Sequence, residues 1–366
     1  MTMKLILESW RRFSNLVEGG NKSPKTRDTV LNPELVKKAI AIYEQVMLDW
    51  GKWLTEQGKE PIKPLRPVGS VSYYEKDLTE RPGTIYGDID YLVEFPFSSD
   101  SGDDTSRRKR ENAVKREYTQ FFVDYLNSGN AHQNISVDET LLGNVLMVIL
   151  ELDQEVFIQA DTVITFPQYS DWMNGSYTPQ RGLKGYTMGR LFTAVGNYFP
   201  LSISVDGVVA RTQDGKLVTG NVRKGVEIQT ISSNPRTFLI DIAKHFAGEN
   251  AVIDPRLQQS GGVDPDNISI KSLSSSIKAL AATLEVANIV SANEMLTKIQ
   301  ELYKTGLQAQ ADDQMKWANR KFEEMKTDGS PDSDAQKYLQ GEQATHQKLL
   351  KLNKQAMELF LAGMQE

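Results

Sequence analysis

Hydrophobic positions along the chain follow a helical spacing in some segments and an alternating, strand-like spacing in others. Residues 32–57 place apolar side chains every three to four positions after an Asn-Pro pair, which predicts a capped amphipathic helix. A second helical pattern covers residues 107–126. Runs rich in β-branched and aromatic residues predict three strands, at 86–95, 145–152 and 156–166.

The second half of the chain changes from strand-like to helical patterning. Strands are expected over 201–212 and 216–229, where Asp-Gly pairs indicate tight turns. The helical spacing begins near residue 234 and resumes after a loop expected at 254–266. We expect three helices beyond that loop, at 269–290, at 292–325 with an interruption, and at 332–362.

These patterns predict an α+β protein, in which a mixed sheet with flanking helices is followed by a mostly α-helical C-terminal region. At the start of the chain, residues 3–17 have the spacing of a short amphipathic helix, and residues 18–29 have the polar composition of a linker. We therefore expect four units: a leader helix and linker at 1–31, a core at 32–200, a strand-containing extension with a connecting helix at 201–267, and a helical domain at 268–366.

Composition removes several kinds of chemistry from consideration. The chain has no cysteine, so it has no disulfide framework, thiol nucleophile or thiolate zinc site. Its three histidines, His132, His245 and His346, are far apart in sequence, which argues against a histidine-based metal centre. No apolar run reaches the roughly eighteen residues of a membrane span, so we expect a cytoplasmic protein without membrane contact. The formal net charge of -6 argues against broad binding of nucleic acid.

Two aspartates in the strand expected at 86–95 are the first candidates for chemistry. Side chains alternate faces along a strand, so Asp88 and Asp90 should point the same way. Carboxylates this close repel one another unless a cation lies between them, and Mg²⁺ or Mn²⁺ prefers such oxygen ligands. An Asp-x-Asp pair on a strand edge is nevertheless common without a metal.

A third carboxylate, Asp161, is the sole charge in the strand expected at 156–166. Burying it without a partner would be costly, so a bound cation or an opening at an active site is the better explanation. Backbone donors around a single inward aspartate are the alternative. Glu151 and Asp153 are rival third ligands, but they lie near the expected hairpin turn, where exposure to solvent accounts for them.

A Gly69-Ser70 pair precedes the acidic strand. A glycine lets the backbone approach a polyphosphate closely, and the Ser70 hydroxyl and neighbouring N–H groups can donate to its oxygens. A Gly-Ser pair in a turn is common by itself. Its occurrence before two acidic strands is much less common, and the combination indicates a site for a nucleoside triphosphate and two metal ions.

In this order, the residues resemble the nucleotidyltransferase superfamily of DNA polymerase β, which has a Gly-Ser pair, an Asp-x-Asp pair and a distal aspartate on a third strand. The run Gly-Asp-Ile-Asp-Tyr-Leu-Val-Glu-Phe-Pro at 87–96 is similar to the non-templated branch, which includes archaeal CCA-adding enzymes, oligoadenylate synthases and bacterial cyclic-oligonucleotide synthases. The resemblance covers about residues 32–167. The stretch from Ser70 to Asp88 is several residues longer than in these relatives, with an insertion at 76–83.

The resemblance implies that Asp88 and Asp90 coordinate two Mg²⁺ or Mn²⁺ ions, and that Asp161 joins the catalytic ion and is a candidate general base. It implies transfer of a nucleoside monophosphate from an NTP, such as ATP, to an acceptor hydroxyl with release of pyrophosphate. An RNA 3′ end is the preferred acceptor; modification of a protein or small molecule and synthesis of cyclic oligonucleotides are alternatives. The rival class is a catalytically idle module of the same fold that acts as a phage virion or scaffold component.

Basic residues supply candidates for contacts with phosphate. Arg181, Lys184 and Arg190 follow the third acidic strand, and this position favours nucleotide binding, although charges that only decorate a loop and a helix start would look the same. The basic run at 107–110 opens an amphipathic helix and is typical of a solvated helix surface. The helical C-terminus is a candidate for oligomerisation or acceptor binding.

The first helix has a second, shorter resemblance, to the leaders of tailed-phage internal proteins that are cut after a Leu/Ile-x-Glu triplet during capsid maturation. Leu16, Val17 and Glu18 form such a triplet before Gly19. The resemblance implies a protein packaged in a virion, and an ordinary amphipathic helix is the alternative.

Overall fold

The computed structural model describes residues 31–84, 86–97, 104–129, 135–142, 145–153, 156–172, 183, 185–204, 207–213, 216–217, 226–260, 269–327 and 332–366. The leader helix, its Leu-x-Glu triplet and the linker lie outside the described residues, as do Arg181 and Lys184.

The N-terminal half is built on a five-stranded mixed sheet with the order β1-β2-β5-β4-β3. Strands β2 and β5 are parallel, and the other neighbouring pairs are antiparallel. The strands are β1 (Lys63–Val68), β2 (Ile89–Glu94), β3 (Ile135–Leu142), β4 (Val145–Asp153) and β5 (Val156–Thr165). The strands expected at 145–152 and 156–166 are therefore confirmed, while the two edge strands, β1 and β3, were not predicted.

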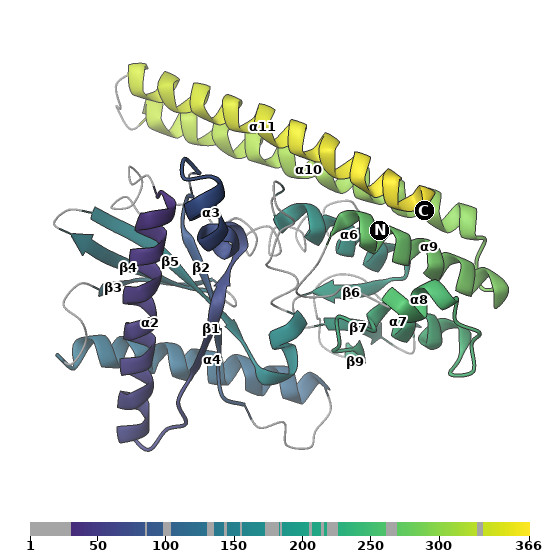
Figure 1. The fold of residues 1–366 in the computed structure, drawn as a ribbon, viewed down its shortest axis with the longest axis horizontal. Coiled ribbons are helices and arrows are strands. Elements are labelled where there is room, and N and C mark those ends of the chain that lie inside the picture. Colours follow the sequence, from purple (N-terminus) through teal and green to yellow (C-terminus); the bar gives the residue numbers. More distant parts are fainter. Residues whose placement is uncertain are drawn as a thin grey trace.

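Two helices, α2 (Pro33–Glu56) and α4 (Asp104–Asn127), cover one face of this sheet (Figure 1). Helix α2 begins as predicted, because the Asn32 side chain caps it by accepting a hydrogen bond from the Leu35 N–H at 2.9 Å. Trp50 of α2 is buried edge-on against Phe95 and against Phe122 of α4, which joins both helices to the sheet. Helix α4 begins at residue 104, before the helical pattern expected at 107–126.

The connection from β1 to β2 contains the short helices η1 (Gly69–Tyr73) and α3 (Tyr74–Glu80). The strand expected at 86–95 is shorter than predicted, since β2 begins at Ile89. Tyr86 instead pairs with Leu31 in an isolated antiparallel bridge, and Gly87 lies at a bend between this bridge and β2. Asp88 therefore immediately precedes the strand.

A second unit follows the first sheet, starting with α6 (Gly185–Tyr198). In its antiparallel sheet, β7 (Gly207–Gln213) pairs with the other three strands, which are β6 (Leu201–Ser204), β8 (Lys216–Leu217) and β9 (Glu227–Ser232). The strand expected over 216–229 corresponds to β8 and β9, with residues 218–225 outside the described residues.

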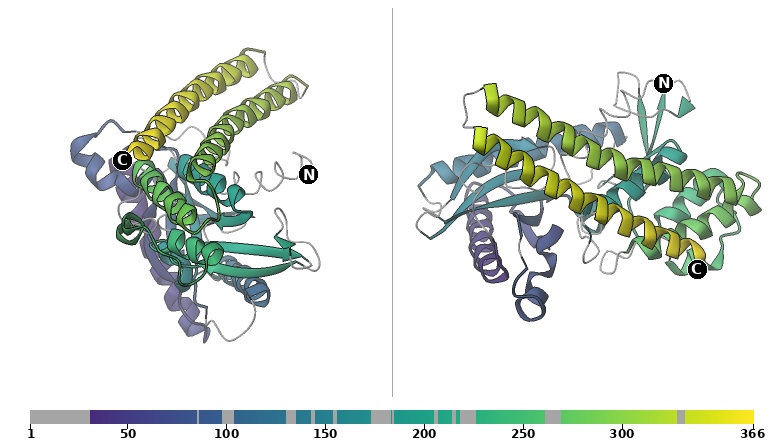
Figure 2. Two further views of the ribbon diagram at one scale, coloured as in Figure 1. Left: turned by 90° about the vertical axis from the view of Figure 1, so that its right-hand side faces the viewer. Right: turned by 90° about the horizontal axis from the view of Figure 1, so that it is seen from above.

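The remaining helices are α7 (Phe238–Ala247), α8 (Pro255–Ser260), α9 (Ile270–Val286), α10 (Ala292–Thr327) and α11 (Asp332–Gln365). The predicted interruption of α10 is wrong, because the helix continues through the buried Gly306. Helix α8 lies inside the loop expected at 254–266, and the Asp254 side chain accepts a hydrogen bond from the Arg256 N–H at its start. Helices α10 and α11 lie side by side and extend past the rest of the second unit (Figures 1 and 2).

The buried apolar residues form two clusters. One lies between α2, α4 and the face of the first sheet that these helices cover. The other is formed by the second unit, and it includes Val68, Leu92 and Val163 from the opposite face of the first sheet. The side chains of α6, which belongs to the expected core at 32–200, pack in this second cluster. Both faces of the first sheet are thus covered along part of their length.

Candidate metal centre

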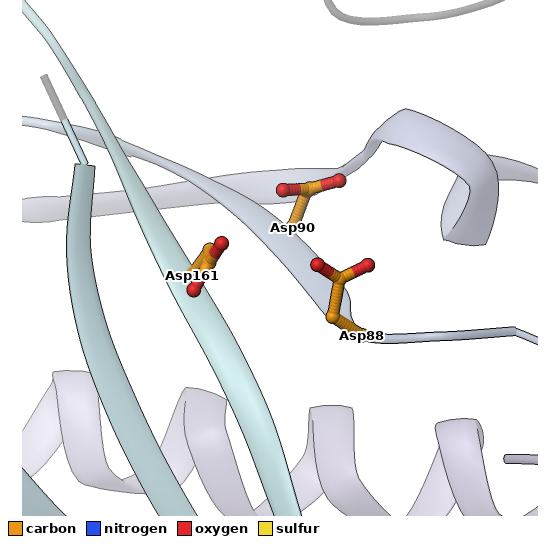
Figure 3. A group of neighbouring side chains, drawn as sticks. All are labelled: Asp88, Asp90 and Asp161. Carbon is orange, nitrogen blue, oxygen red and sulfur yellow. The ribbon is translucent and has the colours of Figure 1, made fainter. Parts of the chain in front are cut away.

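The three predicted aspartates meet at the centre of the first sheet. Asp90 on β2 and Asp161 on β5 are direct partners in the parallel register, and Asp88 immediately precedes β2. Each carboxylate offers one oxygen, and these three oxygens all lie within 4.8 Å of one another. Figure 3 shows the three side chains converging from the two neighbouring strands. The sequence placed Asp88 and Asp90 on one face and named Asp161 as the third carboxylate, and the fold brings all three together.

The acidic group lies on the sheet face opposite α2 and α4. Thr162, the residue after Asp161, points to the other face, where its hydroxyl and that of Tyr43 form a 2.6 Å hydrogen bond. Leu92 and Val163 lie two residues after Asp90 and Asp161, and both contribute to the apolar cluster of the second unit. The carboxylates therefore lie beside the junction of the two units.

The environment of the group favours a cation. Asp88 and Asp161 are buried, with 4% and 5% of their surface exposed, and Asp90 is half-buried. Burial, followed by the charges of Asp88 and Asp161, raises the pKa of Asp90 well above its ordinary value. A divalent ion would remove this mutual repulsion, and three carboxylate oxygens are the hard ligands that Mg²⁺ and Mn²⁺ prefer. The residues thus fit a site for such an ion.

Gly69 lies directly against this group. It opens η1 with φ +67°, a left-handed conformation that favours glycine. The preceding residue, Val68, is the register partner of Asp90, and a Cβ on Gly69 would overlap Oδ2 of that aspartate. The hydroxyl of Ser72 donates to the Gly69 carbonyl at 2.9 Å and closes the turn. Ser70, the next residue, is exposed in the same turn.

Gln159 is a neighbour of the group that the sequence did not single out. It lies on β5 two residues before Asp161, is fully buried, and donates from Nε2 to Oδ1 of Asp161 at 2.8 Å. The sequence offered one signal: Gln159 is a polar residue two positions before Asp161 in a mostly apolar run, so strand alternation places both side chains on one face. A single glutamine in a strand could equally have faced solvent, so the signal was weak.

Residues 76–83, expected to be an insertion, are held to the segment that leads into β2. Helix α3 holds Asp77, which is buried and accepts a 2.7 Å hydrogen bond from the Tyr86 hydroxyl. Tyr86 lies two residues before Asp88 and is also held by the backbone of Leu31. Helix α3 therefore supports the segment that carries Asp88.

The rival carboxylates lie elsewhere. Met147, four residues before Glu151 on β4, is the residue that opposes Asp161, while Glu151 opposes Phe157. Asp153 pairs with Val156 at the end of the same hairpin. Asp161 is accordingly the third member of the acidic group, and Glu151 and Asp153 are at the turn end of the strands.

The predicted basic contacts have a different setting. Arg190 is buried on α6 and donates a hydrogen bond to Gln310 of α10, inside the second unit. In the basic run at the start of α4, Arg107 donates to Thr230 of β9 at 3.0 Å and lies 3.6 Å from the Glu111 carboxylate, while Lys109 and Arg110 are exposed. Arg107 thus links the first sheet's helix to the second sheet.

No protein-family model matches the chain, and a comparison with curated proteins gives no significant match. Among the described helices, none is both long and apolar enough to cross a membrane.

Proposed function

We propose that this protein is a metal-dependent nucleotidyltransferase, which moves a nucleoside monophosphate from an NTP to an acceptor hydroxyl and releases pyrophosphate. The observation that supports the proposal is the pairing of Asp90 with Asp161 across parallel strands, with Asp88 beside them and three ligand oxygens within 4.8 Å. Transfer of a nucleotidyl group needs positioning and charge neutralisation more than a covalent enzyme intermediate. A carboxylate cluster on a rigid sheet supplies the positioning, and the cations that it recruits supply the charge neutralisation.

In this proposal, Asp88 and Asp90 would hold two Mg²⁺ or Mn²⁺ ions, and Asp161 would be a further ligand of the catalytic one. Ions bound there would neutralise the triphosphate and lower the pKa of the acceptor hydroxyl. The acceptor oxygen forms a bond to the α-phosphorus, the bond to the β-phosphate oxygen breaks, and pyrophosphate leaves. The hydroxyl proton passes to a carboxylate oxygen of Asp161 or to solvent.

Gly69 and Ser70 have a binding role in the proposal. Because Gly69 has no Cβ, its backbone can lie beside Asp90, which leaves the ligand oxygens accessible to a triphosphate. The exposed Ser70 hydroxyl, one residue on, can donate to a phosphate oxygen. Arg190 is the described member of the predicted basic cluster, and its bond to Gln310 favours a role in holding α6 against α10.

The test is incubation of the purified protein with each labelled NTP, Mg²⁺ or Mn²⁺, and separate acceptor pools of tRNA, total RNA and protein. Analysis of the nucleotide products would also detect cyclic oligonucleotides. Asp88→Asn and Asp161→Asn should each lower label transfer by at least on the order of 100-fold. Asp124→Asn is the matched control, since Asp124 is exposed on α4 and bonds only within that helix to Gln120 in the contacts seen.

The outcomes separate the two classes of function. Transfer that is lost in Asp88→Asn and Asp161→Asn but retained in Asp124→Asn supports the enzyme and identifies the acceptor. Transfer that survives in all variants assigns the activity to another site. No transfer to any pool, together with no Mn²⁺ binding by the wild-type protein, would overturn the proposal and favour the idle module.

A further inference from the structure

Gln159 is an unusual side chain for its location. It has none of its surface exposed, and it lies on β5 between apolar residues, on the same face as Asp161. Burying a primary amide is unfavourable unless its hydrogen bonds are made, and an apolar residue of the same size would avoid that desolvation. The hydrogen bonds of this amide must therefore offset the cost of burying it.

One of these hydrogen bonds is with an aspartate of the candidate metal centre. Nε2 of Gln159 donates to Oδ1 of Asp161 at 2.8 Å, with both side chains buried. An ionised carboxylate can only accept hydrogen bonds, so the NH₂ end of the amide must face it. In the view of Figure 3, Asp161 directs one carboxylate oxygen toward Asp88 and Asp90 and the other away from them. A hydrogen bond to either oxygen fixes the rotation of the carboxylate about its Cβ–Cγ bond.

A neutral donor has a specific advantage here. An arginine or lysine in the same place would also hold Asp161, but its charge would neutralise the carboxylate and compete with a divalent cation. The amide leaves the full negative charge available. Ile89 is the register partner of Ala160 on the parallel strands β2 and β5. Gln159 and Asp88 each lie one residue before this pair, so both precede the Asp90–Asp161 pair along their strands.

We propose that Gln159 is a positioning residue for the metal centre: its amide N–H orients Asp161 so that the carboxylate presents one oxygen to a divalent ion. This inference rests on the proposed function, because it concerns the same site. Residues that hold metal ligands in this way change metal affinity by about 10- to 100-fold when they are replaced.

The chain offers a matched pair of variants. Gln159→Met keeps the length and approximate volume of the side chain but removes the donor. Gln168→Met makes the same replacement at a second glutamine whose Nε2 donates to a carboxylate, that of Glu111 on α4, at 3.0 Å. The two variants lose the same kind of bond, and only the first bond involves the metal centre. Gln159→Asn, which shortens the amide by one methylene, serves if the methionine variant does not fold.

The measurement is Mn²⁺ affinity by calorimetry, with the electron paramagnetic resonance spectrum of the bound ion and the melting temperature in metal-free buffer. We expect Gln159→Met, or Gln159→Asn, to bind Mn²⁺ about 10- to 100-fold more weakly and with an altered spectrum, and Gln168→Met to bind as the wild type does. Equal affinity and spectra in the wild type and both Gln159 variants would overturn the role of Gln159 and leave the metal centre intact. A wild-type protein that does not bind Mn²⁺ would overturn the metal centre itself.

Discussion

The backbone of Gly69 lies so close to the carboxylate of Asp90 that any larger residue at position 69 would require this carboxylate to move. A Cβ at Gly69 would overlap Oδ2 of Asp90, and the glycine has φ +67°. One position therefore has two separate constraints, a left-handed backbone and a close contact with a candidate metal ligand. Another glycine has only the first constraint: Gly58 has φ +70°, with nothing within 4 Å of where its Cβ would lie.

The two glycines allow strain and displacement to be measured separately. Gly58→Ala should lower the free energy of unfolding by about 1 kcal/mol through its backbone alone and leave Mn²⁺ binding unchanged. Gly69→Ala should show a larger loss and also weaken Mn²⁺ binding, because Asp90 has to move. Urea denaturation and calorimetry on both variants provide the comparison. Equal effects of the two variants on Mn²⁺ affinity would contradict the role assigned to Gly69.

The acidic group should make stability depend on pH in the metal-free protein. The folded pKa of Asp90 is raised, so between the ordinary aspartate pKa of about 3.9 and this raised value the folded state binds more protons than the unfolded state. Stability should therefore be highest at the acid end of this window and fall as the pH rises through it, by up to about 1.4 kcal/mol per pH unit.

Melting curves in EDTA at several pH values above 4 test this dependence. Asp90→Asn should flatten the decline, and saturating Mg²⁺ should remove it by neutralising the carboxylates. A metal-free protein whose stability rises steadily over the same interval would show that the repulsion among Asp88, Asp90 and Asp161 is not significant.

The hydrogen bond between Tyr43 and Thr162 should stabilise the fold without affecting metal binding. The two hydroxyls are 2.6 Å apart in the interior, on the sheet face opposite the carboxylates. Tyr43→Phe or Thr162→Val leaves one buried hydroxyl without this bond and should cost about 1–3 kcal/mol, whereas the double variant should lose less than the sum. Mn²⁺ affinity should stay within about twofold of wild type in all three. A large loss of affinity in Tyr43→Phe would mean that α2 also controls the metal centre.

The bond between Asp77 and Tyr86 should, in contrast, affect both stability and the metal centre. Tyr86→Phe removes a buried 2.7 Å hydrogen bond two residues before Asp88, so we expect a stability loss of about 1–3 kcal/mol and weaker Mn²⁺ binding. Tyr118→Phe is the control, because the Tyr118 hydroxyl donates to the Glu60 carbonyl at 2.9 Å on the α4 side. The control should lose stability alone. The same Mn²⁺ affinity in both variants would argue that α3 does not support Asp88.

The sequence predicted those features that local patterning determines. The alternation of side chains along a strand placed Asp88 and Asp90 together, and the solitary charge of Asp161 in an apolar run identified the third carboxylate. The cap at Asn32 marked the start of α2 because Asn-Pro is a local signal that is independent of the rest of the fold.

The features that the sequence missed depend on distant parts of the chain. The strand containing Asp90 starts late because Tyr86 pairs with Leu31, 55 positions away. Helix α10 passes through Gly306 without an interruption, and this residue is buried in the fold. The contact of Gln159 with Asp161 could be recognised only from the folded sheet, since a glutamine in a strand is equally compatible with a position that faces solvent.

The shared core described above has a consequence for shortened versions of the protein. Val68, Leu92 and Val163 belong to the first sheet but are buried by the second unit. A chain that ended after Trp172 would still contain Asp88, Asp90 and Asp161, yet it would expose an apolar surface directly beside them. A fragment that contains all three aspartates would therefore lack part of the apolar core beside them, and we expect it to be less stable than the full chain.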